Sequence, residues 1–188
     1  MDNNRSIRKK EYQLGQKLFA LRRFYNRRRK QKMIQGKNYI VLSKKLSKMS
    51  YKNVYGGELQ TCSKKTMALT GFTRDGECRN HDDDAGSHHV CIDFSSTTGG
   101  NFCSVTGQPN WCEEKMPCHE KNGEKCPIKN WCVCEWAFAS YIKKAGGCDK
   151  IADVVCEATN QKALQHYEAS DAPHVKRALE CLKEKCNI

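Results

Sequence analysis

The apolar positions of the first third of the chain predict one amphipathic helix. In RKKEYQLGQKLFALRRFYNRRRKQKMI (8–34), apolar side chains recur at intervals of four, three and four residues, which places them on one helix face. These residues are Leu14, Leu18, Leu21 and Tyr25. Gly36 is a suitable end for this helix. The next segment (37–55) holds a short apolar run followed by Lys- and Ser-rich sequence.

Strand patterns occur further along the chain. SHHVCIDF (87–94) alternates between apolar and polar positions, so that Val90 and Ile92 share one face of a predicted strand. IADVVCEAT (151–159) predicts a second strand, short and buried. CSKKTMALTGFTRDGEC (62–78) predicts an extended segment with a turn at its R-D-G sequence.

Three helices are predicted after the strand at 87–94. CEWAFASYIKKAGG (134–147) is the clearest, because it carries an apolar side, two lysines near its end and a terminal Gly pair. NQKALQHY (160–167) predicts a short helix. The last helix, DAPHVKRALECLKEKC (171–186), is expected to be capped by Ser170 and to carry Pro173 in its first turn.

Residues 95–130 show neither a helical nor a strand period. A loop of this length is unusual in a compact domain. Its four cysteines suggest that cross-links hold it in place; they are Cys103, Cys112, Cys118 and Cys126. The whole pattern predicts an α+β fold: a small cysteine-rich domain with short strands and about three helices, preceded by a basic helical or extended N-terminal arm.

Charge divides the chain into two parts. Residues 1–60 contain 17 Lys and Arg against three Asp and Glu, which gives a net charge of +14. Residues 61–188 contain 16 and 18 respectively, which gives −2. The Gly-Gly pair of YKNVYGGEL, near residue 58, is a suitable hinge. The sequence therefore predicts a basic N-terminal arm over 1–60 and a cysteine-rich α+β domain over 61–188.

All thirteen cysteines lie within the second part, at a density typical of a disulfide-stapled or metal-bound scaffold. We expect them to be structural, with one left over because their number is odd. They are Cys62, Cys78, Cys91, Cys103, Cys112, Cys118, Cys126, Cys132, Cys134, Cys148, Cys156, Cys181 and Cys186.

The basic arm requires a partner if it is to be ordered, because an isolated helix with so many like charges repels itself. Three interpretations stay open: a solvated tail, an arm that binds the nucleic-acid backbone, or an arm that threads between protein neighbours. The expected contact residues are Arg22, Arg23, Arg27, Arg28, Arg29 and Lys30.

The stretch NWCVCEW (130–136) is the strongest candidate for chemistry. Its C-x-C spacing fits neither a zinc knuckle nor the C-x-x-C of thioredoxin-like sites. Its two tryptophans favour burial. A nucleophilic site would pair a cysteine with His88 or His89, helped by Asp93, but so many cysteines make some Cys–His proximity inevitable.

Metal chemistry has weak support in the sequence. The acidic stretch HDDDAGSHH (81–89) lacks the alternation of a calcium loop and is expected to be a solvated turn. We therefore expect no cofactor, no metal site, no catalytic residue and no enzyme activity. The alternative is a thiol- or metal-dependent enzyme at Cys132 and Cys134, with Cys91 and His88 as further members.

Four motifs in order resemble one protein family. They are T-G-F-x-R-D-G-x-C (70–78), G-x-H-x-V-C (86–91), W-C-x-C (131–134) and E-A-T (157–159). The pattern is similar to that of domain-of-unknown-function family 2237 over about residues 62–168, which implies a compact α+β domain without an assigned activity or cofactor. Five cysteines match family positions in this comparison, namely Cys62, Cys78, Cys91, Cys132 and Cys134, and the other eight do not.

Localisation and partners are inferred from what the chain lacks. Its first 30 residues show no secretory signal, and no segment approaches a membrane span. Many cysteines without secretion suggest a dedicated oxidising pathway, such as the thiol oxidases that large cytoplasmic DNA viruses encode. We therefore expect a minor capsid protein of a large DNA virus, assembled in the host cytoplasm and bound to neighbouring capsid proteins. The alternative is a ribosome-associated protein that binds nucleic acid through residues 1–60.

Overall fold

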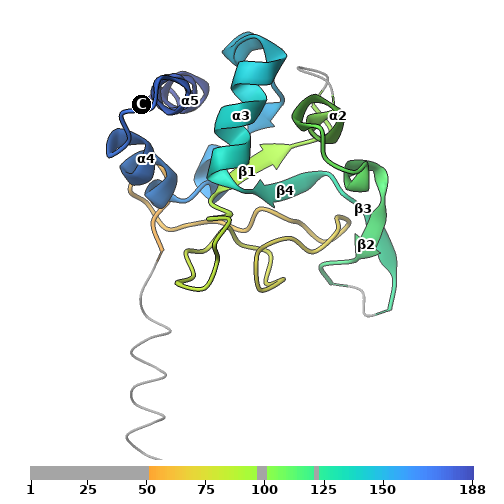
Figure 1. Cartoon of the computed structure of the whole chain (residues 1–188). Coiled ribbons are helices and arrows are strands. Elements are labelled where there is room, and N and C mark those ends of the chain that lie inside the picture. Colours follow the sequence, from red (N-terminus) through yellow and green to blue (C-terminus); the bar gives the residue numbers. More distant parts are fainter. Residues whose placement is uncertain (1–50, 97–100, 121–122) are drawn as a thin grey trace, which may run out of the picture. The chain divides into compact units, whose positions relative to one another are not determined.

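The computed structural model describes residues 51–96, 101–120 and 123–188, which belong to one compact unit. The helix predicted within 8–34 and the six basic contact residues lie outside the described residues. The predicted α+β fold is confirmed: short strands form a small sheet, and helices cover one of its faces (Figure 1). No helix in the described part of the chain is long and apolar enough to cross a membrane.

The central sheet has three antiparallel strands in the order β4-β1-β5. These are β1 (Val90–Asp93), β4 (Asn130–Val133) and β5 (Asp153–Val154). Strand β1 confirms the prediction at 87–94, since Val90 and Ile92 both enter the main core. The strand predicted over 151–159 is wrong in length: β5 has two residues, and a 3₁₀ helix (Cys156–Ala158) follows it. An apolar run of this kind predicts that the segment is buried but does not determine its backbone conformation.

Three helices follow the sheet strands as predicted. They are α3 (Glu135–Ala145), α4 (Gln161–Glu168) and α5 (Pro173–Cys186). Helix α3 ends where Gly146 adopts a left-handed conformation (φ 92°) and donates its N–H to the carbonyl of Ile142. Figure 1 shows α3 above the sheet, between α5 and α2 (Phe102–Thr106), and both of these helices contact it.

The start of α5 differs from the prediction. Ala172, not Ser170, is the N-cap residue, and no side chain caps the helix there. The hydroxyl of Ser170 instead accepts a hydrogen bond from the N–H of Ala172. Pro173, at the first helical position, has no N–H that requires a cap. The Ser170 hydroxyl therefore stabilises the turn before the helix and not the helix end.

Residues 95–130 contain more structure than the predicted loop. Besides α2, the segment holds a 3₁₀ helix (Trp111–Glu113) and a hairpin of β2 (Lys115–Pro117) and β3 (Lys125–Pro127). The Asn101 side chain caps α2 by accepting the N–H groups of Cys103 and Ser104. These elements are too short to produce a sequence period, which is why only the cross-linking was foreseen.

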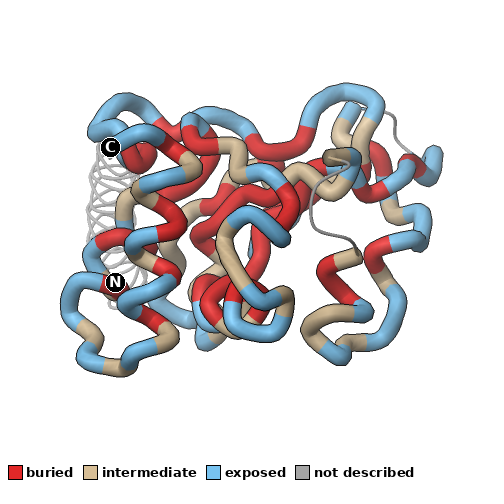
Figure 2. The backbone as a smooth tube through the Cα atoms, turned by 90° about the horizontal axis from the view of Figure 1, so that it is seen from above, coloured by how far each residue is buried: buried red, intermediate tan, exposed pale blue. Residues whose placement is uncertain are grey.

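The compact domain begins before the boundary predicted near residues 58–60. The N–H of Val54 donates to the carbonyl of Thr159, and the N–H of Gln60 donates to that of Glu157. Asn53 is buried and pairs with Asn160. Figure 2 shows buried residues running through the middle of the domain. Charge and cysteine content change near residue 60, but packing against the segment at 157–160 starts earlier.

Candidate functional site

Twelve of the thirteen cysteines form six disulfides, and Cys134 alone is unpaired. The pairs are Cys62–Cys91, Cys78–Cys132, Cys103–Cys112, Cys118–Cys126, Cys148–Cys181 and Cys156–Cys186. The cross-linking expected for residues 95–130 is present as two short-range pairs. Of the two cysteines in NWCVCEW, Cys132 is bridged and Cys134 is the one left over by the odd number.

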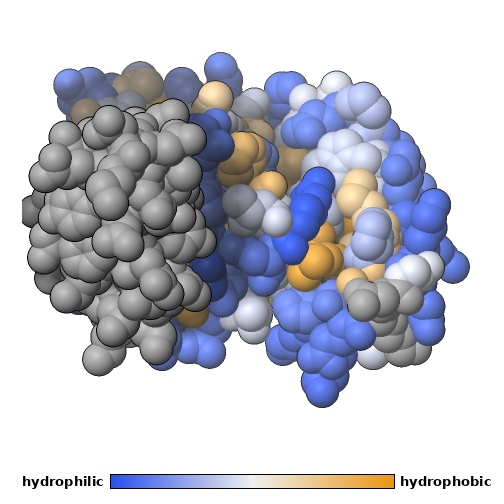
Figure 3. Space-filling model, turned by 90° about the horizontal axis from the view of Figure 1, so that it is seen from below, coloured by the Kyte–Doolittle hydropathy of each residue, from blue (hydrophilic) through white to orange (hydrophobic). Residues whose placement is uncertain are grey.

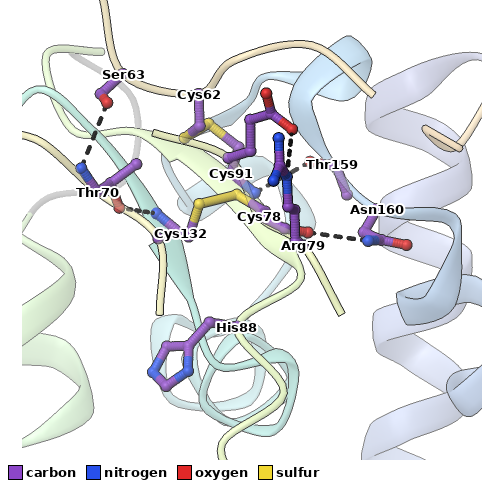
Figure 4. The surroundings of a disulfide bond; sticks show 12 residues. Cys62, Ser63, Thr70, Cys78, Arg79, His88, Cys91, Cys132, Thr159 and Asn160 are labelled. Atoms are coloured by element: carbon purple, nitrogen blue, oxygen red, sulfur yellow. Dashed lines mark hydrogen bonds and ion pairs between the residues drawn. A yellow bond between two sulfur atoms is a disulfide. The ribbon is translucent and has the colours of Figure 1, made fainter. Parts of the chain in front are cut away.

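Two disulfides meet at the centre of the sheet. Cys91 of β1 lies opposite Cys132 of β4, and each bonds a cysteine of the 62–78 segment (Figure 4). All four sulfurs are buried in a cluster of their own, on the sheet face opposite to Val90 and Ile92. The hydroxyl of Thr70 accepts the N–H of Cys132 in the same region. These bridges therefore attach the irregular 62–78 segment to the sheet, in which it does not take part as a hydrogen-bonded strand.

The same bridges remove two members of the predicted reactive group. Cys91 and Cys132 are disulfide-bonded, so neither provides a thiol. Of the four residues proposed for an enzyme site, Cys134 and His88 stay available.

Cys134 is the N-cap residue of α3 and is half-buried. Burial raises the pKa of its thiol, although the N–H groups of Ala137 and Trp136 at the start of the helix act in the opposite direction. The thiol is therefore protonated at neutral pH and needs a base before it can act as a nucleophile. Trp136, which was expected to be buried beside it, has 42% of its surface exposed, whereas Trp131 is buried.

Cys134 lines a cavity of about 70 Å³ together with His88 and the aromatic side chains of Trp111 and Trp131. The cavity is open to solvent and lies where β4 meets α3. Within the described residues, no hydrogen bond joins the His88 ring to the Cys134 sulfur. The two groups thus line the same cavity without a hydrogen bond between them.

His88 is oriented by a buried carboxylate. Its Nδ1 lies 2.8 Å from Oδ1 of Asp84, and the backbone N–H of His88 donates to Oδ2 of the same residue. Burial opposes ionisation of Asp84, but these hydrogen bonds, with one from the N–H of Gly86, hold its pKa below the ordinary value. The Asp84 carboxylate therefore favours the tautomer in which Nδ1 carries the proton and Nε2 is a free base.

The loop before β1 leaves room for the contact between His88 and Asp84. A Cβ atom added to Gly86 would lie 2.6 Å from Cε1 of His88, so a larger residue displaces the ring.

The turn at 81–89 was expected to be solvated throughout, which is wrong for Asp84: Asp82 and Asp83 are exposed, whereas Asp84 is buried. Asp93, predicted as a helper of histidine, instead bonds Ser95. The D-x-x-x-H spacing of Asp84 and His88 was the sequence signal that could have revealed their pairing.

These features define a disulfide-stapled α+β domain in which one unpaired thiol shares a cavity with a carboxylate-oriented histidine. The chain belongs to domain-of-unknown-function family 2237, described as uncharacterized proteins conserved in bacteria, which it matches over residues 52–175. The resemblance predicted from the four motifs is confirmed at the level of the family. No curated protein is significantly similar to the chain.

Proposed function

We propose that this chain is a non-enzymatic structural protein of a large assembly, specifically a minor capsid protein of a large DNA virus. The pairing of the cysteines carries the proposal. The eight cysteines predicted to lie outside the family positions bond only with one another, in four separate pairs. They add cross-links to the family domain without disturbing the bridges at its centre.

Each added bridge fixes a peripheral element. Two of them hold the 101–127 region together, while Cys148–Cys181 and Cys156–Cys186 tie α5 to the segment around β5. A disulfide typically contributes about 2–4 kcal/mol by restricting the unfolded chain. Such reinforcement suits a protein that persists outside a cell, and it requires the oxidising pathway already expected for virion proteins.

The surface of the described domain favours attachment through residues 1–60. Its large exposed hydrophobic residues are few and are Tyr55, Phe72, Trp136 and Ile188. On the face drawn in Figure 3, most described residues are hydrophilic and the hydrophobic ones gather in small patches. A stable interface normally needs a larger apolar centre. We therefore assign anchoring to the arm, whose charge of +14 suits an acidic groove on neighbouring capsid proteins.

Particle sedimentation tests this role. The full chain is expected to co-sediment with virions made in the host cytoplasm, and a variant with Arg22, Arg23, Arg27, Arg28, Arg29 and Lys30 changed to Gln is expected to stay in the soluble fraction. The control variant carries six Lys→Gln changes on the exposed surface of the domain. A wild-type chain that is monomeric and absent from particles would refute the proposal. Attachment that nuclease abolishes and salt weakens steeply would support nucleic-acid binding instead.

A thiol-dependent activity at Cys134 is the second candidate, and the cavity shared with His88 favours it. In this account, Nε2 of His88 takes the thiol proton as the sulfur attacks an electrophilic carbon of the substrate. Iodoacetamide provides a simple probe: the S–C bond forms, the C–I bond breaks and iodide leaves. His88→Gln is expected to slow alkylation of Cys134 by at least about tenfold at neutral pH.

His174→Gln is the matched control for that experiment, since it makes the same change on α5, away from the cavity. It is expected to leave the alkylation rate unchanged. Equal rates for wild type and His88→Gln would remove the thiol site from consideration and leave the structural role intact.

A further inference from the structure

A second cluster of ionisable side chains follows two residues of the Cys134 cavity in the chain but does not line that cavity. It consists of His89, which precedes β1, Glu135, the first residue of α3, and His166 on α4. Nδ1 of His89 lies 2.8 Å from Oε2 of Glu135, and Nδ1 of His166 lies 2.6 Å from Oε1. The three groups thus converge from three separate elements, with their ligand atoms within 4.8 Å of one another.

The carboxylate at the centre of this cluster is fully buried. Glu135 has no exposed surface, and neither Lys nor Arg pairs with it among the described residues. An ionised carboxylate removed from water needs a compensating positive charge. A metal ion bound by Glu135 and the two histidines supplies such a charge, and a proton within the cluster is the alternative.

The surroundings of His89 are compatible with metal binding. Its other ring nitrogen, Nε2, lies 3.1 Å from Oδ1 of Asn80. A neutral imidazole has one N–H, and if Nε2–H donates to Asn80, the lone pair of Nδ1 points at Glu135. In that tautomer the two acceptors, 2.8 Å apart, repel unless a proton or a metal ion is bound by both of them. A metal-binding histidine commonly donates its second N–H to an oxygen in this way.

We propose that His89, Glu135 and His166 bind a divalent transition-metal ion such as Zn²⁺. Two imidazole nitrogens and a carboxylate are a ligand set that zinc takes in proteins, and three protein ligands leave one position for water. Access is available at His166, whose side chain is 37% exposed and is stacked on the exposed Trp136. The ion would join the start of α3 to β1 and α4.

This proposal is independent of the assembly role and of Cys134. Of its three ligands, only His89 belongs to the acidic stretch at 81–89 that was considered for metal binding from the sequence. The contribution of Glu135 and His166 was not foreseen, because neither stands in a metal-binding sequence motif.

Metal uptake by the full, disulfide-bonded chain tests the site. After treatment with a chelator and dialysis, the protein is incubated with Zn²⁺ or Co²⁺ and passed through a desalting column. Elemental analysis is expected to find one ion per chain. The Co²⁺ form is expected to show visible d–d bands without an intense sulfur-to-cobalt band in the near ultraviolet, because its ligands are nitrogen and oxygen.

Variants separate this site from other histidines and from the thiol. Glu135→Gln and His166→Gln are expected to abolish stoichiometric uptake, while Asn80→Ala is expected to weaken it about 10–100-fold. His174→Gln and Cys134→Ser are the controls and are expected to bind as wild type does. Because Glu135 is buried, its variant is checked for folding by circular dichroism, and the partly exposed His166 provides the second test.

Two results would overturn the proposal. One is a wild-type chain that retains no stoichiometric Zn²⁺ or Co²⁺ after desalting, which would show that hydrogen bonds and protons alone satisfy Glu135. The other is a folded His166→Gln variant that binds the metal as tightly as wild type.

Discussion

Removing the Cys78–Cys132 bridge is expected to destabilise the domain more than removing any short-range bridge. This disulfide spans 54 residues, whereas Cys118–Cys126 spans eight. Loop-closure entropy grows with the logarithm of the loop length and gives about 4 kcal/mol for the first bridge and about 2.5 kcal/mol for the second. The two bridges nested inside the longer loop shorten it by about a third, which changes its value by only a few tenths of a kcal/mol.

The measurement is the free energy of unfolding in urea, for two double variants compared with wild type. Cys78→Ala/Cys132→Ala is expected to lose about 4 kcal/mol, with some additional loss because both sulfurs are buried and leave space behind. Cys118→Ala/Cys126→Ala is the matched control and is expected to lose about 2.5 kcal/mol. Intact mass before unfolding confirms that the remaining five bridges have formed in each variant.

The comparison is decided by the difference between the two variants. Loop entropy alone predicts a difference of about 1.4–1.7 kcal/mol, and both variants also lose packing because the cysteines of both bridges are buried. Equal losses would show that loop length does not govern the contribution of these bridges. A larger loss for the hairpin bridge would show that the 62–78 segment is held mainly by its hydrogen bonds, such as that from Cys132 to Thr70.

Three further predictions concern individual side chains. Without reduction, the native chain is expected to take up one alkylating group at Cys134, and none in Cys134→Ser, when measured by intact mass; a second modified site would contradict six disulfides. The pKa of Asp84 is lower in the folded chain, so its contribution to stability is present above the ordinary value of about 3.9 and is lost as pH falls through the folded value. Asp84→Asn is therefore expected to flatten the fall in the urea midpoint on acidification, and an unchanged pH profile would contradict this. The hydroxyl of Tyr167 donates to the buried carbonyl of Glu135, so Tyr167→Phe is expected to cost about 1–3 kcal/mol, while the exposed Tyr55→Phe leaves the free energy of unfolding unchanged.

Elements with enough residues to show a period were predictable from the sequence. The helices α3, α4 and α5 and the strand β1 all follow their apolar spacing. The hairpin of β2 and β3 and the helix α2 were missed, since three residues do not complete two periods of a strand and five do not complete two turns of a helix. Their positions depend on disulfides instead, and cysteine connectivity cannot be read from spacing.

The candidate sites were only partly predictable, for a different reason. His88 and Cys134 were named as candidates, but Asp84 was treated as one of three solvated carboxylates. Its burial depends on the turn around Gly86, which makes its oxygens accept N–H groups from the backbone. Likewise, Glu135 and His166 are 31 residues apart, and only the packing of α4 against the start of α3 brings them together.

The bridges fall into two groups. Of the five cysteines predicted to match family positions, four form the two bridges at the sheet and the fifth is the unpaired Cys134. The remaining eight bond only with one another.

Complete pairing of these eight cysteines has a physical advantage. A lone thiol can exchange with an existing bridge, while a pair placed within bonding distance closes on itself. Two of the pairs span only nine and eight residues, so their partners meet with little loss of chain entropy. Cys134, at the start of α3, can then stay reduced in the cavity that it shares with His88. The cross-linked shell and the unpaired thiol are therefore compatible in one chain, and the structural role does not require the cavity to be chemically inert.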